Sequence, residues 1–137
     1  RLSSRHFFLP GAEELLSALH GRYTLCLASN GTGWVQEGRL KNSGILPLLD
    51  RVFISEYLGA NKPQLGFFDA CFASLPGVKR SESLMLGDSL TSDMLGGKIA
   101  GMHTCWYNPN HLPLPTDGTV EYQIHRLPDL LPLLKRL

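Results

Sequence analysis

Residues 85–97, MLGDSLTSDMLGG, place two carboxylates at the point where an apolar run ends. Gly87 permits a tight turn after the run, Asp88 follows at once, and Asp93 falls in the first turn of the helical pattern that comes next. Two interpretations fit this spacing. Either Asp88 or Ser89 caps the helix and Asp93 complements its dipole, or the carboxylates hold a hard metal ion. The stretch taken alone favours neither.

The rest of the chain repeats this alternation of short β-rich runs and longer helical patterns. The expected strands are Tyr23–Ala28, Arg51–Ser55, Ser83–Leu86, His103–Trp106 and Glu121–His125. The expected helices cover residues 10–21, 34–42, 64–74, 90–100 and 128–136, and the segment 107–118 is expected to be an ordered surface connection or a flap. Short connections between alternating elements predict an α/β fold, a Rossmann-like three-layer α/β/α arrangement with a mostly parallel sheet.

Composition argues for one domain with a small ligand. The chain has 137 residues, is 43% hydrophobic and carries a formal net charge of +1, with its basic residues scattered along the chain. This balance predicts neither a nucleic-acid surface nor a membrane surface as the main partner. Cys26, Cys71 and Cys105 lie far apart in or beside apolar segments, and they are expected to be buried thiols in a reducing cytoplasm.

Polar residues also follow two other expected strands. Ser29, Asn30 and Gly31 come after the first of these strands and just before a helical pattern, where a hydroxyl and free backbone N–H groups can hold an anion. Lys62 and Pro63 precede the helix expected from residue 64, so Lys62 is expected at or next to its N-cap. Each feature alone has an ordinary structural explanation. Together with the two aspartates at one sheet edge, they predict a site that binds and polarises a phosphoryl group.

These residues resemble the motifs of the haloacid dehalogenase (HAD) superfamily of phosphohydrolases. LASNG is similar to the second motif, GANKP to the third and LMLGDSLTSD to the fourth, while GDSLTSDMLGGKIAGMHTCWYNP resembles the pyrimidine 5′-nucleotidase-like branch. The resemblance implies that Asp88 ligates Mg²⁺ directly and that Asp93 orients a metal-bound water or Lys62 without contacting the metal. It implies that Ser29 and the N–H of Asn30 hold phosphoryl oxygens and that Lys62 neutralises charge on the nucleophile and the phosphate.

The chain departs from the family pattern at the nucleophile. In the family an Asp-x-Asp motif on the central strand forms an aspartyl-phosphate, and here no two aspartates are separated by one residue. Asp50 precedes a strand, so it is expected at the opposite edge of the sheet. Residues 1–137 are therefore expected to be the C-terminal part of a HAD-like core, incomplete because the central nucleophile strand is absent. The helical cap is expected to be absent too, and no second domain is expected.

The resemblance therefore implies an Mg²⁺-dependent phosphomonoester hydrolase that acts on a nucleoside monophosphate or a sugar phosphate. This chain by itself is expected to be inactive, and either the missing N-terminal segment or another chain is expected to complete the sheet. One alternative is a non-catalytic phosphate-binding or regulatory module with a degenerate HAD fold. A receiver-like or flavodoxin-like signalling domain shares the fold class, but it would need an acidic cluster early in the chain.

Overall fold

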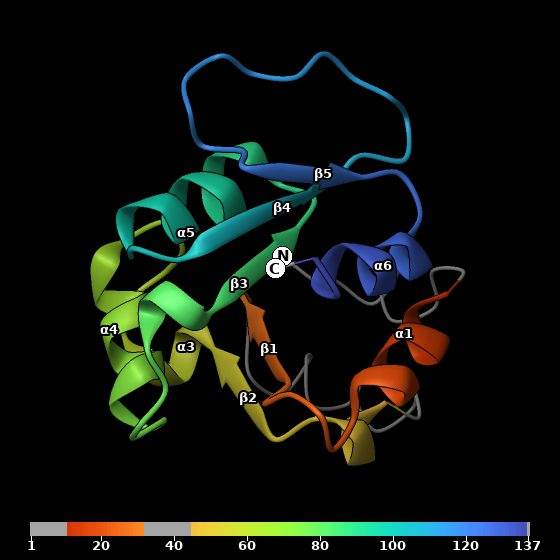
Figure 1. Cartoon of the computed structure of the whole chain (residues 1–137). Coiled ribbons are helices and arrows are strands. Elements are labelled where there is room, and N and C mark those ends of the chain that lie inside the picture. Colours follow the sequence, from red (N-terminus) through yellow and green to blue (C-terminus); the bar gives the residue numbers. More distant parts are fainter. Residues whose placement is uncertain (1–10, 32–44, 137) are drawn as a thin grey trace.

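The computed structural model describes residues 11–31 and 45–136, and it has the alternating order of strands and helices that the sequence predicts (Figure 1). The strands are β1 (Cys26–Ser29), β2 (Arg51–Ile54), β3 (Leu84–Gly87), β4 (His103–Tyr107) and β5 (Tyr122–Ile124). The α-helices are α1 (Ala12–Leu19), α3 (Ser55–Leu58), α4 (Leu65–Ala73), α5 (Leu95–Ile99) and α6 (Leu130–Leu134). Pro10 and the helix expected over residues 34–42 lie outside the described residues.

All strand pairs in the described part of the chain are parallel, so the predicted α/β class is confirmed. β1 pairs with β2, and a separate sheet has the order β3-β4-β5. Strand β1 begins at Cys26, later than expected, because the chain leaving α1 first forms a turn that leaves Tyr23 exposed. This shift makes Ser29 the last residue of the strand.

Helices cover both faces of the strands, as Figure 1 shows, with α3, α4 and α5 on one side and α1 and α6 on the other. Side chains alternate between the faces. Met85 and Trp106 belong to the apolar cluster that includes residues of α4, whereas Leu84 and Cys105 pack with residues of α1 and α6. The three-layer arrangement therefore follows from strands that are apolar on both faces.

A cavity of about 1100 Å³ separates the two sheets. Residues of β1 and of β3 line it, among them Leu27, Ala28, Leu84 and Leu86. Within residues 11–31 and 45–136 no backbone ladder joins β1 to β3. The facing edges of these two strands therefore border an apolar space.

The cysteine prediction is correct for two residues and wrong for the third. Cys71 and Cys105 are buried, and burial raises the pKa of each thiol to about 12, so both remain protonated at neutral pH. Cys26 is exposed, because it begins the strand that borders the cavity rather than a strand packed on both sides. All three cysteines are free thiols.

The helix that follows β3 differs from the single helix expected over residues 90–100. It starts with a π-helical turn, Leu90–Met94, and continues as α5. Close packing of α5 depends on a small residue, since a Cβ on Gly96 would lie 2.7 Å from the ring of Phe68 in α4. Near the C-terminus, Pro132 falls in the first turn of α6, where proline is tolerated.

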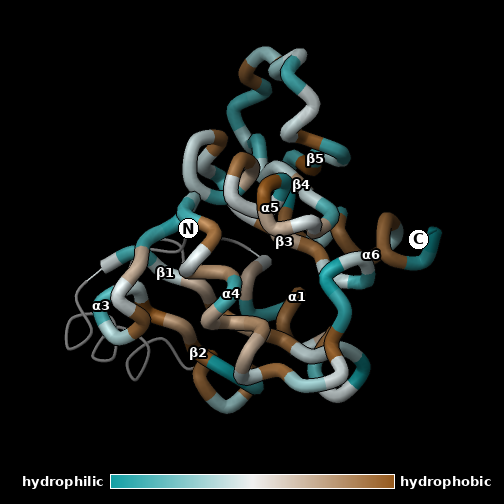
Figure 2. Tube along the Cα trace, turned by 90° about the vertical axis from the view of Figure 1, so that its left-hand side faces the viewer, coloured by the Kyte–Doolittle hydropathy of each residue, from teal (hydrophilic) through white to brown (hydrophobic). Residues whose placement is uncertain are grey.

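The connection between β4 and β5 extends away from the layers in both Figure 1 and Figure 2. Its first turn is held by Asn108, whose side chain accepts a hydrogen bond from the N–H of Leu112 and donates one to the carbonyl oxygen of the same residue. Leu112 and Leu114 are exposed along it. No helix among the described residues is both long enough and apolar enough to span a membrane.

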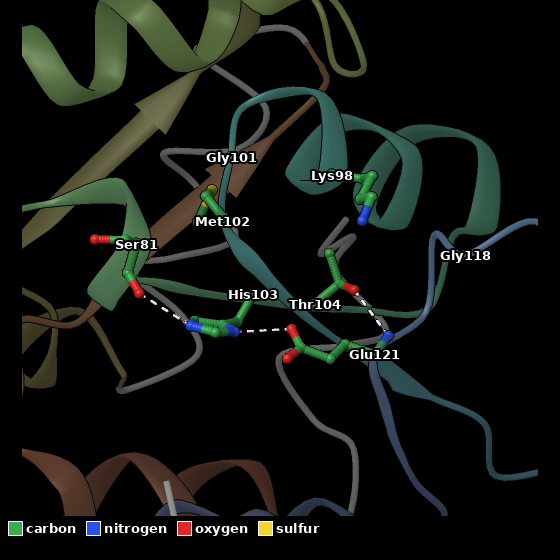
Figure 3. Close-up of a pocket in the computed structure, with 8 residues that line it drawn as sticks. All are labelled: Ser81, Lys98, Gly101, Met102, His103, Thr104, Gly118 and Glu121. Atoms are coloured by element: carbon green, nitrogen blue, oxygen red, sulfur yellow. Dashed lines mark hydrogen bonds and ion pairs between the residues drawn. The ribbon is translucent and has the colours of Figure 1, made fainter.

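A smaller cavity of about 490 Å³ lies at the amino end of β4, where His103 bridges two segments (Figure 3). Nδ1 of His103 lies 2.8 Å from Oε1 of Glu121, and Nε2 lies 2.9 Å from the carbonyl oxygen of Ser81. The hydrogen bond to Glu121 raises the pKa of His103. Desolvation opposes this rise, while the charge of Glu121 and the carbonyl of Ser81 add to it. Both ring nitrogens face acceptors, which favours the imidazolium.

Because its pKa is raised in the folded protein, His103 contributes stability that is fully present below the ordinary histidine pKa. This contribution is lost as the pH rises through the raised pKa. Glu121→Gln should therefore lower the melting temperature more at pH 6 than at pH 9. Because both side chains are 43% exposed, the difference should be only about 1–3 °C. Thermal denaturation of the protein expressed from its complete reading frame measures it. Glu82→Gln, which alters an exposed carboxylate on the neighbouring turn, is the control; equal losses at both pH values would contradict the prediction.

Candidate active site

A buried ion pair lies at the carboxyl ends of the strands. Nζ of Lys62 lies 2.6 Å from Oδ1 of Asp93, and both side chains are 0% exposed. The same ammonium donates a 2.8 Å hydrogen bond to the carbonyl oxygen of Ala28 in β1. On the other side of the pair, Oδ2 of Asp93 accepts a hydrogen bond from the N–H of Ser89. One ion pair therefore connects the end of β1, the segment before α4 and the turn after β3.

The segment that carries Lys62 is fixed by Asn30. The N–H of Lys62 donates to Oδ1 of Asn30 at 2.9 Å, and Nδ2 of Asn30 donates to the carbonyl oxygen of Lys62 at 3.1 Å. The expectation that Lys62 lies at or next to the N-cap of α4 is wrong by one residue, because Gln64 is the N-cap and Lys62 lies two residues before it in a turn. The lysine is held in place by the Asn30 side chain rather than by the helix end.

The loop after β1 is also anchored from β2. Ser55 follows this strand directly, and its buried hydroxyl oxygen accepts a 3.0 Å hydrogen bond from the N–H of Gly31. Ser29, the residue at the end of β1, is 0% exposed. The residues predicted to hold a phosphoryl group, Ser29 and Asn30, therefore lie in a backbone segment with fixed anchors on both sides.

The turn after β3 contains the helix cap that the first interpretation of residues 85–97 expects, and metal binding stays a prediction. Ser89 caps the helical turn, since its hydroxyl oxygen accepts a hydrogen bond from the N–H of Ser92. Asp93 does more than complement a helix dipole, because its carboxylate is buried against Lys62. Asp88 lies between the strand and the cap, half-buried, and it lines the large cavity.

Gly87 has a different role from the tight turn expected of it. It is the last residue of β3, and a Cβ at this position would overlap the carboxylate of Asp93. A glycine is therefore required for close approach of Asp93 to the strand, not for an unusual backbone angle.

The residues present fit one side of a magnesium site. Mg²⁺ prefers oxygen ligands, keeps several waters and is often bound by one or two carboxylates together with substrate phosphates. Asp88 is such a carboxylate at the sheet edge, and Asp93 beside it is already engaged by Lys62. Among the described residues no group of three or more His, Cys, Asp or Glu side chains could hold a metal. Further carboxylate or imidazole ligands would have to come from outside the described residues.

Asp50 lies away from this edge, as its position before a strand predicts. Its carboxylate accepts a 2.7 Å hydrogen bond from the N–H of Leu25, at the amino end of β1. It therefore cannot replace a nucleophile at the carboxyl ends of the strands.

Sequence reasoning did not identify Ser55 or the side-chain role of Asn30. Ser55 directly follows a strand. Ser29 and Asp88 were identified by that criterion, so it could also have identified Ser55. The Asn30–Lys62 contact joins residues 32 positions apart, and no local pattern indicates it.

Adding a methyl group at Gly87 should displace Asp93 from Lys62. We expect Gly87→Ala to lower the free energy of unfolding by about 1–3 kcal/mol, the usual cost of an overpacked buried site. Gly66→Ala is the matched control, since a Cβ there meets nothing closer than 3.7 Å and alanine is the better helix former. Urea denaturation of both variants tests this. A Gly87→Ala protein as stable as the unaltered one would show that the carboxylate tolerates the methyl group.

Comparison with known proteins identifies relatives of this chain. The family model described as haloacid dehalogenase-like hydrolase matches residues 4–107. Pyrimidine 5′-nucleotidase PynA from Streptococcus pneumoniae is 42% identical over 129 residues, which cover 93% of this chain and 54% of the relative. Pyrimidine 5′-nucleotidase YjjG from Escherichia coli is 36% identical, over 92% of this chain and 56% of the relative.

A solved structure extends the similarity to three dimensions. The putative HAD-hydrolase YfnB from Bacillus subtilis, in a structure bound to magnesium, aligns with a TM-score of 0.89 and 36% identity over 92% of this chain and 55% of that one. The chain thus spans about half the length of the relatives it matches. The family model covers most of the chain, and the fold agrees with it, so this chain belongs to the haloacid dehalogenase-like hydrolase family.

Proposed function

We propose that this chain is part of an Mg²⁺-dependent phosphomonoester hydrolase. The observation that carries the proposal is the buried Lys62–Asp93 pair, tied on one side to the loop after β1 and on the other to the turn that bears Asp88. A lysine, an anion-binding loop and a carboxylate at one edge of a parallel sheet form the surroundings that phosphoryl transfer requires. Relatives named as nucleotidases add support.

Each residue of the chain has a part in this proposal. Ser29 and the N–H of Asn30 bind phosphoryl oxygens, and the ammonium of Lys62 offsets their negative charge. Asp93 holds the lysine in place, because the two side chains share one buried contact. Asp88 is the direct metal ligand. Magnesium, when bound, supplies positive charge that stabilises the phosphoryl group as it is transferred.

The nucleophile is assigned to a segment outside these 137 residues. The sequence contains no Asp-x-Asp, and the large cavity lies between β1 and β3. We propose that one further parallel strand, from the same reading frame or from another chain, fills this cavity. Its carboxyl end would then reach the same edge as Lys62 and Asp88, where a nucleophilic aspartate is needed.

A nucleoside monophosphate or a sugar phosphate is the proposed substrate. The relatives support the first, since the names of two of them specify pyrimidine 5′-nucleotides. Another relative, from Pyrococcus furiosus and 30% identical, is named glyceraldehyde 3-phosphate phosphatase, which keeps the second class open.

Replacing Asp88 tests the metal assignment. In the protein expressed from its complete reading frame, Asp88→Asn should lower kcat/KM for a pyrimidine nucleoside monophosphate by roughly 100-fold or more, because a neutral amide is a poor Mg²⁺ ligand. Asp69→Asn is the matched control, since Asp69 is an exposed carboxylate on α4 paired with Arg80. Full activity of Asp88→Asn at the same Mg²⁺ concentration would refute the assignment.

The 137-residue chain alone should release no phosphate from the same substrates at any Mg²⁺ concentration, whereas the product of the complete reading frame should. Release of inorganic phosphate measures both. Turnover by the 137-residue chain would disprove an external nucleophile. Phosphate binding without turnover by the complete product would instead favour the regulatory-module alternative.

A further inference from the structure

We propose that Trp106 is a positioning residue that holds the peptide of Asp88 in the orientation that metal binding requires. This inference rests on the proposed function, because it assigns a role toward the magnesium ligand of that site. Trp106 is 2% exposed in β4, and its indole Nε1–H donates a 3.1 Å hydrogen bond to the carbonyl oxygen of Asp88.

The sheet register explains how the indole reaches this carbonyl. Trp106 is the parallel-strand partner of Gly87, the residue immediately before Asp88. Paired residues of neighbouring strands project to the same face, and Gly87 has no side chain to occupy the space above the pair. Asp93 fills that space from one direction, and Trp106 contacts the adjoining turn from the next strand.

The peptide unit between Asp88 and Ser89 is hydrogen-bonded at both of its polar groups. Its carbonyl oxygen, on Asp88, accepts from Trp106, and its N–H, on Ser89, donates to Oδ2 of Asp93 at 3.2 Å. A peptide unit is planar, so two hydrogen bonds at its two ends fix its rotation. This rotation sets the backbone angle at Asp88 that aims the carboxylate at the sheet edge.

The two contacts come from different parts of the fold. Asp93 holds the N–H from the π-helical turn, and its own position depends on Lys62. Trp106 holds the carbonyl from β4, and it packs in the apolar cluster that contains Phe67 and Phe68. Without the indole N–H, the half-buried carbonyl oxygen of Asp88 loses this donor, and this end of the peptide loses the restraint that β4 provides.

Trp106→Phe removes the donor but keeps an aromatic ring in the cluster. In the protein expressed from its complete reading frame, calorimetric titration with MgCl₂ and no substrate should show the Kd for Mg²⁺ raised roughly threefold to tenfold, the effect of losing one hydrogen bond. Phe67→Leu is the control, since Phe67 is fully buried in the same cluster. It should lower the melting temperature at least as much but leave the Kd within about twofold.

The outcomes separate this inference from the proposed function. Unchanged Mg²⁺ affinity in Trp106→Phe, alongside a lowered melting temperature, would reduce Trp106 to a packing residue and overturn the inference alone. Equal loss of affinity in Phe67→Leu would do the same, because general loosening of the core would then explain it. Absence of Mg²⁺ binding by the unaltered protein would overturn both proposals.

A measurement on the unaltered side chain applies even where Trp106→Phe fails to fold. In the protein expressed from its complete reading frame, sequential resonance assignment identifies the indole N–H signal of Trp106 in a ¹⁵N-correlated NMR spectrum. The Trp106 indole signal should shift during MgCl₂ titration, with the midpoint found by calorimetry. A signal that does not move while Mg²⁺ binds would contradict a direct link between the indole and the metal ligand.

Discussion

The Lys62–Asp93 ion pair is the interaction on which the rest of this site depends. Two charges that are both 0% exposed are costly to bury unless each is paired and hydrogen-bonded, and here each is. Lys62 also donates to Ala28, and Asp93 also accepts from Ser89. Loss of either partner would leave a buried charge uncompensated, at a cost on the order of 3–5 kcal/mol. The position of three separate chain segments is therefore tied to one contact.

That contact also joins the two parts of the sheet. Among the described residues β1 and β3 share no backbone ladder, and an apolar cavity lies between them. At the carboxyl edge, however, Lys62 reaches the carbonyl of Ala28 in β1 and the carboxylate of Asp93 beyond β3. Away from that edge, α1 packs with residues of α6 in one apolar cluster. The distance between the sheets is thus set by an ion pair at one edge and by helix packing elsewhere.

Local patterns in the sequence were sufficient to predict the parallel α/β fold and the strand end that Asp88 follows. The alternation of apolar runs with helical patterns was the signal. Hydrophobic periodicity and the Gly and Pro residues between segments indicate each element separately. Contacts between distant segments could not be predicted from local patterns. The paired hydrogen bonds of Asn30 with Lys62, the Ser55–Gly31 contact and the space that Gly87 leaves for Asp93 all depend on tertiary packing. The exposure of Cys26 was not predicted for the same reason. The apolar sequence of a strand does not show whether the position beside it in the sheet is occupied by another strand.

Most of the polar contacts at this edge involve the backbone, and this limits what a further strand must contribute. The loop after β1 is held by Asn30 and Ser55, and the turn after β3 is held by a buried carboxylate. In the proposed phosphoryl transfer, these groups would be held in place before charge develops, and such preorganisation is where electrostatic catalysis gains most. The strand that we propose for the cavity would therefore have to bring reacting carboxylates to a site whose other polar groups are already oriented. The entropic cost of ordering those groups arises during folding rather than during the reaction.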